Sequence, residues 1–118
     1  MHELSVASAV LDTATKHARG RPVTAVGLRV GRMRQVVPGS LRFYFEIVAR
    51  DTVCEHARLE LSEIEARLSC SACGHEWEPP FPAFRCPDCA SGEVTLLSGE
   101  ELEVEYIEVE EPQAVTAG

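Results

Sequence analysis

Residues 70–89 read CSACGHEWEPPFPAFRCPDC, and this stretch decides how the chain is organised. It contains two Cys-x-x-Cys pairs with twelve residues between them: Cys70 with Cys73, and Cys86 with Cys89. Each pair is typical of a tight turn that directs two thiolates to one point. A hairpin between the turns would bring all four sulfurs around one tetrahedral Zn²⁺. The segment has too little apolar periodicity for a core of its own, so we predict a separate zinc-ribbon module at residues 67–94.

Disulfides are the alternative use of these four cysteines. The N-terminal segment does not match a secretory signal, because Glu3 and Asp12 lie inside its apolar part. No stretch approaches the roughly 18 continuous apolar residues that a membrane span needs. We therefore expect a cytoplasmic protein, whose reducing compartment favours zinc over disulfides. Four thiolates leave no open coordination position, so we expect this zinc to be structural and not catalytic.

The flanking sequence has the periodicities of helices and strands. Apolar residues recur every three or four positions in two segments, which predicts amphipathic helices at 3–18 and at 38–51. In the first helix the predicted apolar positions are Leu4, Ala7, Val10, Leu11, Ala14 and Ala18. Alternation of apolar and polar residues predicts strands in VTAVGLRVG (23–31), ARLELSEI (57–64) and ELEVEYIEVEEP (101–112). The alternation of the last strand slips at Ile107 and Val109, as a bulge would cause.

These elements predict an α+β fold for the 118 residues. Residues 1–66 and 95–112 would form one domain, a small three-stranded sheet with two helices. The zinc ribbon would be inserted before the last strand, and residues 113–118 would form a disordered tail.

Charge is distributed unevenly along the chain, whose net charge is −8. Residues 19–50 carry seven Arg and one Glu, a net charge of +6, whereas residues 51–118 carry a net charge of −13. We expect the basic and acidic segments to lie side by side in the sheet, where facing opposite charges stabilise strand pairing. An acidic protein of this kind is a poor nucleic-acid binder, because neutralising phosphates needs a clustered cationic face.

The first three residues, Met-His-Glu, carry metal-binding chemistry of a different kind. The α-amine of Met1, the next peptide nitrogen and the imidazole of His2 can close fused chelate rings on one ion, with a donor from Glu3 in the fourth place. Nitrogen donors in a plane favour Ni²⁺ or Cu²⁺ over Zn²⁺. By itself this tripeptide is a weak signal, because His at position two also occurs in termini without function.

Over nearly its full length the chain resembles the HypA/HybF family of nickel metallochaperones. The resemblance rests on the opening MHELS, the run VTAVGLRVGRMRQVVPGSLRFYFEIV, the paired CSAC and CPDC, and the closing SGEELEVEYIEVE. It implies that residues 1–66 and 95–112 form a nickel-binding domain that carries a zinc-ribbon insertion. It also implies a non-enzymatic role in the maturation of nickel enzymes, chiefly the large subunit of [NiFe]-hydrogenase, with a HypB-type GTPase as partner.

The resemblance also implies the ligands by position. His2 is the expected nickel ligand, with the Met1 amine and the Glu3 backbone as co-ligands. The expected zinc ligands are the four cysteines of the paired motifs: Cys70, Cys73, Cys86 and Cys89. The family often has an acidic residue after the proline that begins the second helix, where this chain has Gly39.

A second hypothesis is a zinc-ribbon adaptor that contacts a protein or nucleic acid without nickel. Its contact residues would be the aromatic side chains between the cysteine pairs: Trp77, Phe81 and Phe84. An enzyme is a third, weaker possibility, because the sequence contains no recognisable triad or phosphate loop. Cys54, His56 and His75 receive no assigned role, and His17 lies where a cation suits the end of a helix.

Overall fold

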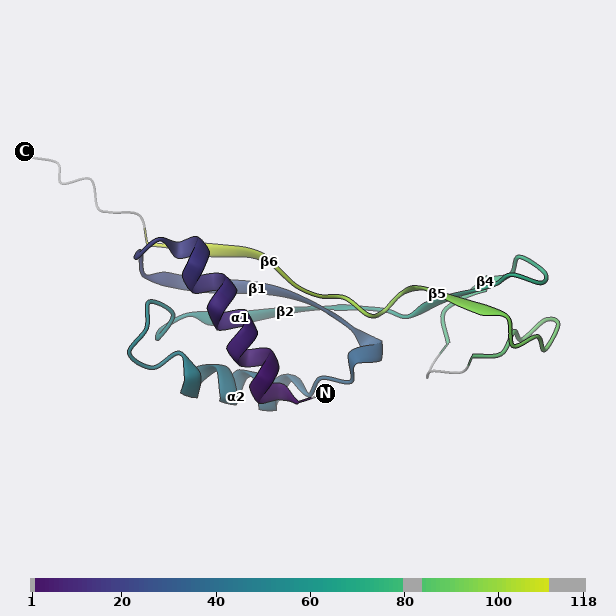
Figure 1. Ribbon diagram of the computed structural model, residues 1–118, viewed down its shortest axis with the longest axis horizontal. Helices are drawn as coiled ribbons and strands as arrows, with labels where there is room; N and C mark the ends of the chain where they lie inside the picture. The colour runs from purple at the N-terminus through teal and green to yellow at the C-terminus, as the bar shows by residue number, and fades with distance from the viewer. Residues whose placement is uncertain (1, 80–83, 111–118) are drawn as a thin grey trace, which may run out of the picture. The chain divides into compact units, whose positions relative to one another are not determined.

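The computed structural model describes residues 2–79 and 84–110 (Figure 1). Its elements follow the order α1 (Glu3–Ala18), β1 (Val23–Gly31), the 3-10 helix η1 (Arg32–Arg34), α2 (Pro38–Val48), β2 (Arg58–Ile64), β3 (Arg67–Cys70), β4 (Glu76–Trp77), β5 (Val94–Ser98) and β6 (Leu102–Val109). The predicted helices and strands are confirmed, with α2 ending three residues earlier than expected.

The chain divides into two compact units. The helical unit comprises the described parts of Met1–Arg29, Val36–Ser62 and Glu103–Gly118, and the cysteine unit comprises Val30–Gln35 and Glu63–Leu102. The predicted domain boundaries at 66/67 and 94/95 stay a prediction, and the predicted tail at 113–118 lies outside the described residues.

A mixed three-stranded sheet has the order β2-β1-β6, with β1 in the centre. The end of β6 lies beside the start of β1, because the amide of Glu110 donates to the carbonyl of Pro22 at 2.9 Å. These two strands are therefore antiparallel. Figure 1 shows β1 and β2 running in the same direction, with α2 in the connection between them. Parallel neighbours need such a crossover, which explains why a helix separates these two strands in the sequence.

The helices pack against each other and cover one face of this sheet (Figure 1). In α2 the buried positions are Leu41 and Phe45, followed by Ala49 just after the helix, and Pro38 occupies the first turn as expected. The predicted apolar face of α1 was partly wrong. Its buried residues are Val6, Ala7, Val10, Ala14 and Ala18, whereas Leu4 is 46% exposed. The helix presents small residues to its neighbours, which allows close packing.

The cysteine unit contains a second three-stranded sheet, which the sequence analysis did not predict. Its order is β4-β3-β5, and β3 pairs antiparallel with both neighbours. Leu68 is the buried centre, opposite Trp77 on β4 and Leu96 on β5. The pairing of Cys70 with Val94 places the first cysteine at the end of this sheet. The sheet therefore supports one side of the cysteine cluster.

Opposite charges meet across β1, β2 and β6, as the charge distribution predicted. Arg29 of β1 contacts Glu103 at 2.8 Å, and Arg58 of β2 contacts Glu108 at 3.9 Å. All four side chains are at least one-third exposed, so each pair contributes at most about 1 kcal/mol. Separately, none of the helices in residues 2–79 and 84–110 is long and apolar enough to cross a membrane.

Candidate metal centres

The four predicted zinc ligands come together in the cysteine unit. The sulfurs of Cys70, Cys73, Cys86 and Cys89 all lie within 4.8 Å of one another. The Cys70–Cys89 and Cys73–Cys86 pairs are each separated by 3.6 Å between sulfurs. Four sulfurs at about 2.3 Å from a tetrahedral zinc ion stand about 3.8 Å apart. The observed spacing therefore suits one tetrahedral metal ion and is too long for S–S bonds.

Both cysteine turns have the same backbone hydrogen bonds. The amide of Gly74 donates to the carbonyl of Cys70 at 2.8 Å, and the amide of Ala90 donates to that of Cys86 at 2.9 Å. The amides of Cys70 and Cys86 in turn donate to the carbonyls of His75 and Ser91, each five residues later in the chain. The residue that reverses the chain has a positive φ in each turn, +80° at Gly74 and +60° at Ala90. These turns direct the two thiols of each pair to the same side through the backbone.

The thiols influence one another's ionisation. Burial raises the pKa of Cys70, but hydrogen bonds from the amides of Cys73 and Ala72 and from neighbouring thiols bring it down to about 7. For Cys73, the His75 amide lowers the pKa, but contacts with Cys86 and the other thiols, together with burial, raise it to about 12. One thiolate therefore forms easily and the next only with difficulty. A bound Zn²⁺ would offset half of the negative charge of four thiolates and allow all four to ionise.

His75 and Asp88 link the two cysteine turns from outside. His75 Nδ1 lies 3.3 Å from Asp88 Oδ2. The ring of His75 stacks on Trp77, with centroids 5.6 Å apart and an interplanar angle of 12°. This link was not predicted, because the sequence gives no sign that residues 75 and 88 face each other. Trp77 is thus engaged within the ribbon, while Phe84 is 51% exposed and Phe81 lies outside the described residues.

The predicted nickel residues lie at the start of α1. His2 is the N-cap residue, with extended backbone angles, and within the described residues its exposed imidazole makes no capping hydrogen bond. The first helical hydrogen bond runs from the amide of Val6 to the carbonyl of His2 at 3.2 Å. Glu3 is half-buried in the first turn, and Met1 lies outside the described residues. The imidazole and the neighbouring backbone nitrogens are therefore available to a ligand.

A hollow of about 490 Å³ lies beside this helix start. It is lined by His2, Glu3 and Leu4 of the N-terminal segment and by Tyr44 of α2. From the sequence, Tyr44 had no assigned role beyond its place in the predicted helix at 38–51. Its proximity to His2 follows from the packing of α2 on α1, which no local sequence signal reveals.

Comparison with known proteins identifies the family. The family model described as "HypA: Hydrogenase/urease nickel incorporation, metallochaperone, hypA" matches residues 1–109. The chain belongs to the HypA family. The hydrogenase maturation factor HypA of Geobacter metallireducens is 40% identical over 110 residues, which is 93% of this chain and 100% of that protein. HypA of Streptomyces avermitilis is 41% identical over 109 residues, covering 88% of this chain and 83% of that one.

The fold of this HypA-family chain also matches a solved structure. The solution structure of the Ni metallochaperone HypA from Helicobacter pylori has a TM-score of 0.67 and 24% sequence identity. The match covers 92% of this chain and 97% of that one. The predicted family and the predicted α+β class are both confirmed.

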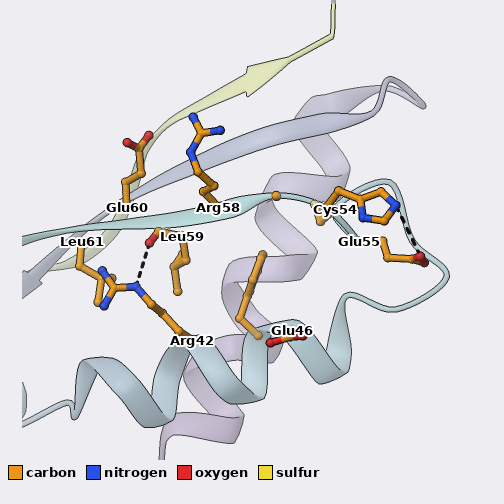
Figure 2. A pocket seen from close by; sticks show the side chains of 11 residues that line it. Arg42, Glu46, Cys54, Glu55, Arg58, Leu59, Glu60 and Leu61 are labelled. Carbon is orange, nitrogen blue, oxygen red and sulfur yellow. Dashed lines mark hydrogen bonds and ion pairs between the residues drawn. The ribbon is translucent and has the colours of Figure 1, made fainter.

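A larger hollow, of about 690 Å³, lies between α2 and β2, and its lining includes Cys54 and His56 (Figure 2). Arg42 of α2 donates from Nε to the carbonyl of Leu59 at 3.2 Å across it. Cys54 is buried, and this burial raises the pKa of its thiol against the opposing effect of a hydrogen bond with Thr15. Among the described residues, the grouping of metal-ligating side chains is the four-cysteine cluster, which excludes Cys54. Cys54 therefore lies apart from the other four cysteines and packs as a small apolar side chain.

Proposed function

We propose that this chain carries Ni²⁺ at its N-terminus and delivers it during maturation of nickel enzymes, chiefly [NiFe]-hydrogenase. The four ligands are the amine of Met1, the backbone nitrogen and imidazole of His2, and the backbone nitrogen of Glu3. One observation carries the proposal: His2 is an exposed N-cap residue whose imidazole is free of a capping hydrogen bond within the described residues. Membership of the HypA family supports nickel as the cargo.

The helix start suits chelation by nitrogen. The first N–H groups of a helix have no partner within it, so Ni²⁺ can replace the amide protons, which pass to water, without breaking a helical hydrogen bond. The first such bond is accepted by the carbonyl oxygen of His2, which is not among the proposed ligands. Adjacent nitrogen donors in a plane favour Ni²⁺.

A carrier must also release its metal. The positive end of the helix dipole disfavours a cation at the start of α1, while the carboxylate of Glu3 in the first turn offsets part of this effect. An exposed terminus with few protein ligands exchanges metal more readily than an enclosed site. These features support transfer over permanent storage.

We assign a structural Zn²⁺ to Cys70, Cys73, Cys86 and Cys89. The sulfur spacing and the soft thiolate donors fit zinc in tetrahedral geometry. A full set of four thiolates gives the bound ion no open position, so the zinc would hold the ribbon together and take no part in catalysis.

The partners follow from this role. We propose a HypB-type nickel GTPase and the hydrogenase large subunit as protein partners in the cytoplasm, with no nucleic-acid or membrane partner and no enzymatic activity. The net charge of −8 repels phosphates, which supports protein partners. Association with the GTPase should weaken with added salt.

The nickel site is tested by calorimetric titration of untagged, zinc-loaded protein. Three matched variants are compared with it: His2→Ala, Glu3→Gln, and the protein extended by one glycine before Met1. His2→Ala and the extension should abolish high-affinity binding, while Glu3→Gln, which keeps the backbone nitrogen, should retain it. Equal affinity with the extension would remove the Met1 amine from the ligand set. Equal affinity in His2→Ala as well would overturn the carrier mechanism.

The zinc site is tested by metal analysis of the purified protein. We expect about one zinc per chain, with loss of that zinc in Cys73→Ser. Cys54→Ser is the matched control, because it removes a thiol outside the cluster and should keep the zinc. Isolation of the protein with disulfides and without zinc would contradict the assignment.

The adaptor hypothesis has weaker support. A ribbon adaptor need resemble known proteins only around residues 67–94, whereas the family match covers residues 1–109. Tight, salt-dependent DNA binding by the intact chain would nevertheless favour it over the carrier.

A further inference from the structure

Tyr44 meets the nickel terminus from a different element of the fold. The hollow at the start of α1 is lined by His2, Glu3 and Leu4, which are consecutive, and by Tyr44, which comes from α2. The contact between the helices brings these residues together. An aromatic ring therefore faces the same space as the metal-ligating residues.

Packing in the core does not explain why a tyrosine stands at position 44. The buried stripe of α2 consists of Leu41 and Phe45 and continues to Ala49, whereas Tyr44 is half-buried at the margin of this stripe. Its neighbour Phe43 is 59% exposed and contacts the Tyr44 ring edge to face, with centroids 5.5 Å apart. Half-burial suits a tyrosine whose ring packs while its hydroxyl contacts water.

We propose that the ring of Tyr44 forms one wall of the nickel site and slows exchange of the bound metal. This inference rests on the proposed function of the N-terminus. A planar four-coordinate ion exchanges ligands when an incoming donor attacks an open face. A ring in the hollow limits the approach of water and competing chelators. Tyr44 is thus a positioning residue and not a ligand, since nitrogen donors are already at hand.

The rate of nickel release tests this proposal. Nickel-loaded protein is mixed rapidly with excess EDTA, and loss of the nickel absorption band is followed with time. Tyr44→Ala should release nickel about threefold to tenfold faster, the range expected for loss of one aromatic contact. Tyr44→Phe should keep the slow rate, because it keeps the ring. The matched control is Phe43→Ala, which removes the adjacent aromatic residue outside the hollow and should release nickel at the unmodified rate.

A second measurement needs no variant. The chain has two tyrosines, Tyr44 and Tyr106. Adding one equivalent of Ni²⁺ should shift the NMR signals of the Tyr44 ring and leave those of the Tyr106 ring in place. Unchanged Tyr44 signals would overturn the proposal even if a variant failed to fold.

The possible results distinguish failure of the Tyr44 proposal from failure of the proposed nickel site at His2. If nickel binds and depends on His2, but Tyr44→Ala releases it at the unmodified rate, only the role of Tyr44 is wrong. Equal acceleration in Phe43→Ala and Tyr44→Ala would also overturn it, because the effect would then belong to the helix. If nickel binding does not depend on His2, both proposals fail. Zinc content and thermal unfolding, measured on every variant, identify any general loss of structure.

Discussion

The ring of Tyr106 covers Gly27, the residue at the middle of the central strand β1, so closely that a β-carbon at position 27 would overlap the ring. The side chain of Tyr106 reaches β2, where its hydroxyl donates a hydrogen bond to Glu60 Oε1 at 3.0 Å. Figure 2 shows Glu60 pointing away from α2, while Leu59 and Leu61 point toward it. One side chain from an edge strand thus spans the sheet on the face opposite the helices.

Gly27→Ala should destabilise the fold, because the added methyl group must displace the ring. We expect a loss of about 1–3 kcal/mol in the free energy of unfolding, measured by urea denaturation. The same substitution made in a Tyr106→Ala background should cost much less, because the obstructing ring is gone. Equal costs in the two backgrounds would show that position 27 is sensitive for a reason other than Tyr106.

Tyr106 should ionise at higher pH than an ordinary tyrosine. The hydrogen bond to Glu60 raises the pKa of its hydroxyl, and burial and the charges of nearby glutamates act in the same direction. Ultraviolet titration of a Tyr44→Phe variant follows Tyr106 alone. Because the folded state holds this proton more tightly, its contribution to stability is present below the ordinary tyrosine pKa and is lost as pH rises through the raised value. Glu60→Ala should lower the titration midpoint, and an unchanged midpoint would contradict the assigned cause.

The two cysteine turns differ in the residue that adopts positive φ. Ala90 takes this conformation at a cost of about 1 kcal/mol relative to glycine, whereas Gly74 does not. Ala90→Gly should therefore strengthen zinc retention, and Gly74→Ala should weaken it. Competition with a zinc chelator measures both variants against the unmodified protein. The same direction of change in the two variants would contradict this account.

Cys54 should resist alkylation in the folded protein. Burial raises its pKa, and thiol-directed reagents react with the thiolate. After removal of zinc, a short treatment with iodoacetamide should modify four cysteines, and unfolding in urea should expose the fifth. Mass spectrometry counts the modified residues. Modification of Cys54 at the same rate as the other four would show that the helical unit opens readily.

Periodicity and spacing predicted the elements of the helical unit and the grouping of the four cysteines, because these depend on local patterns. Arg29 and Glu103 meet as the charge distribution predicted. Leu4 was wrongly placed on the buried face, because an apolar residue in the first turn of a helix can extend beyond the surface that the helix covers.

The second sheet escaped prediction for a different reason. Strands β3 and β4 contain four and two residues, too few for alternation to be recognised, and β5, which pairs with β3, comes from the other side of both cysteine pairs in the sequence. The hollow shared by His2 and Tyr44 depends on the contact between two helices. Contacts of this kind arise from tertiary packing, which the sequence pattern of either helix alone does not contain.

The carbonyl of His2 begins the hydrogen-bond ladder of α1, while the nitrogens proposed to bind nickel lie outside that ladder. The peptide unit between His2 and Glu3 thus has its carbonyl hydrogen-bonded within the helix, while its nitrogen is one of the proposed nickel ligands. Loading and unloading of the proposed site would therefore not require a turn of α1 to unwind. A partner that distinguishes the full carrier from the empty one would then have to contact the metal site itself, at the first few residues and beside Tyr44.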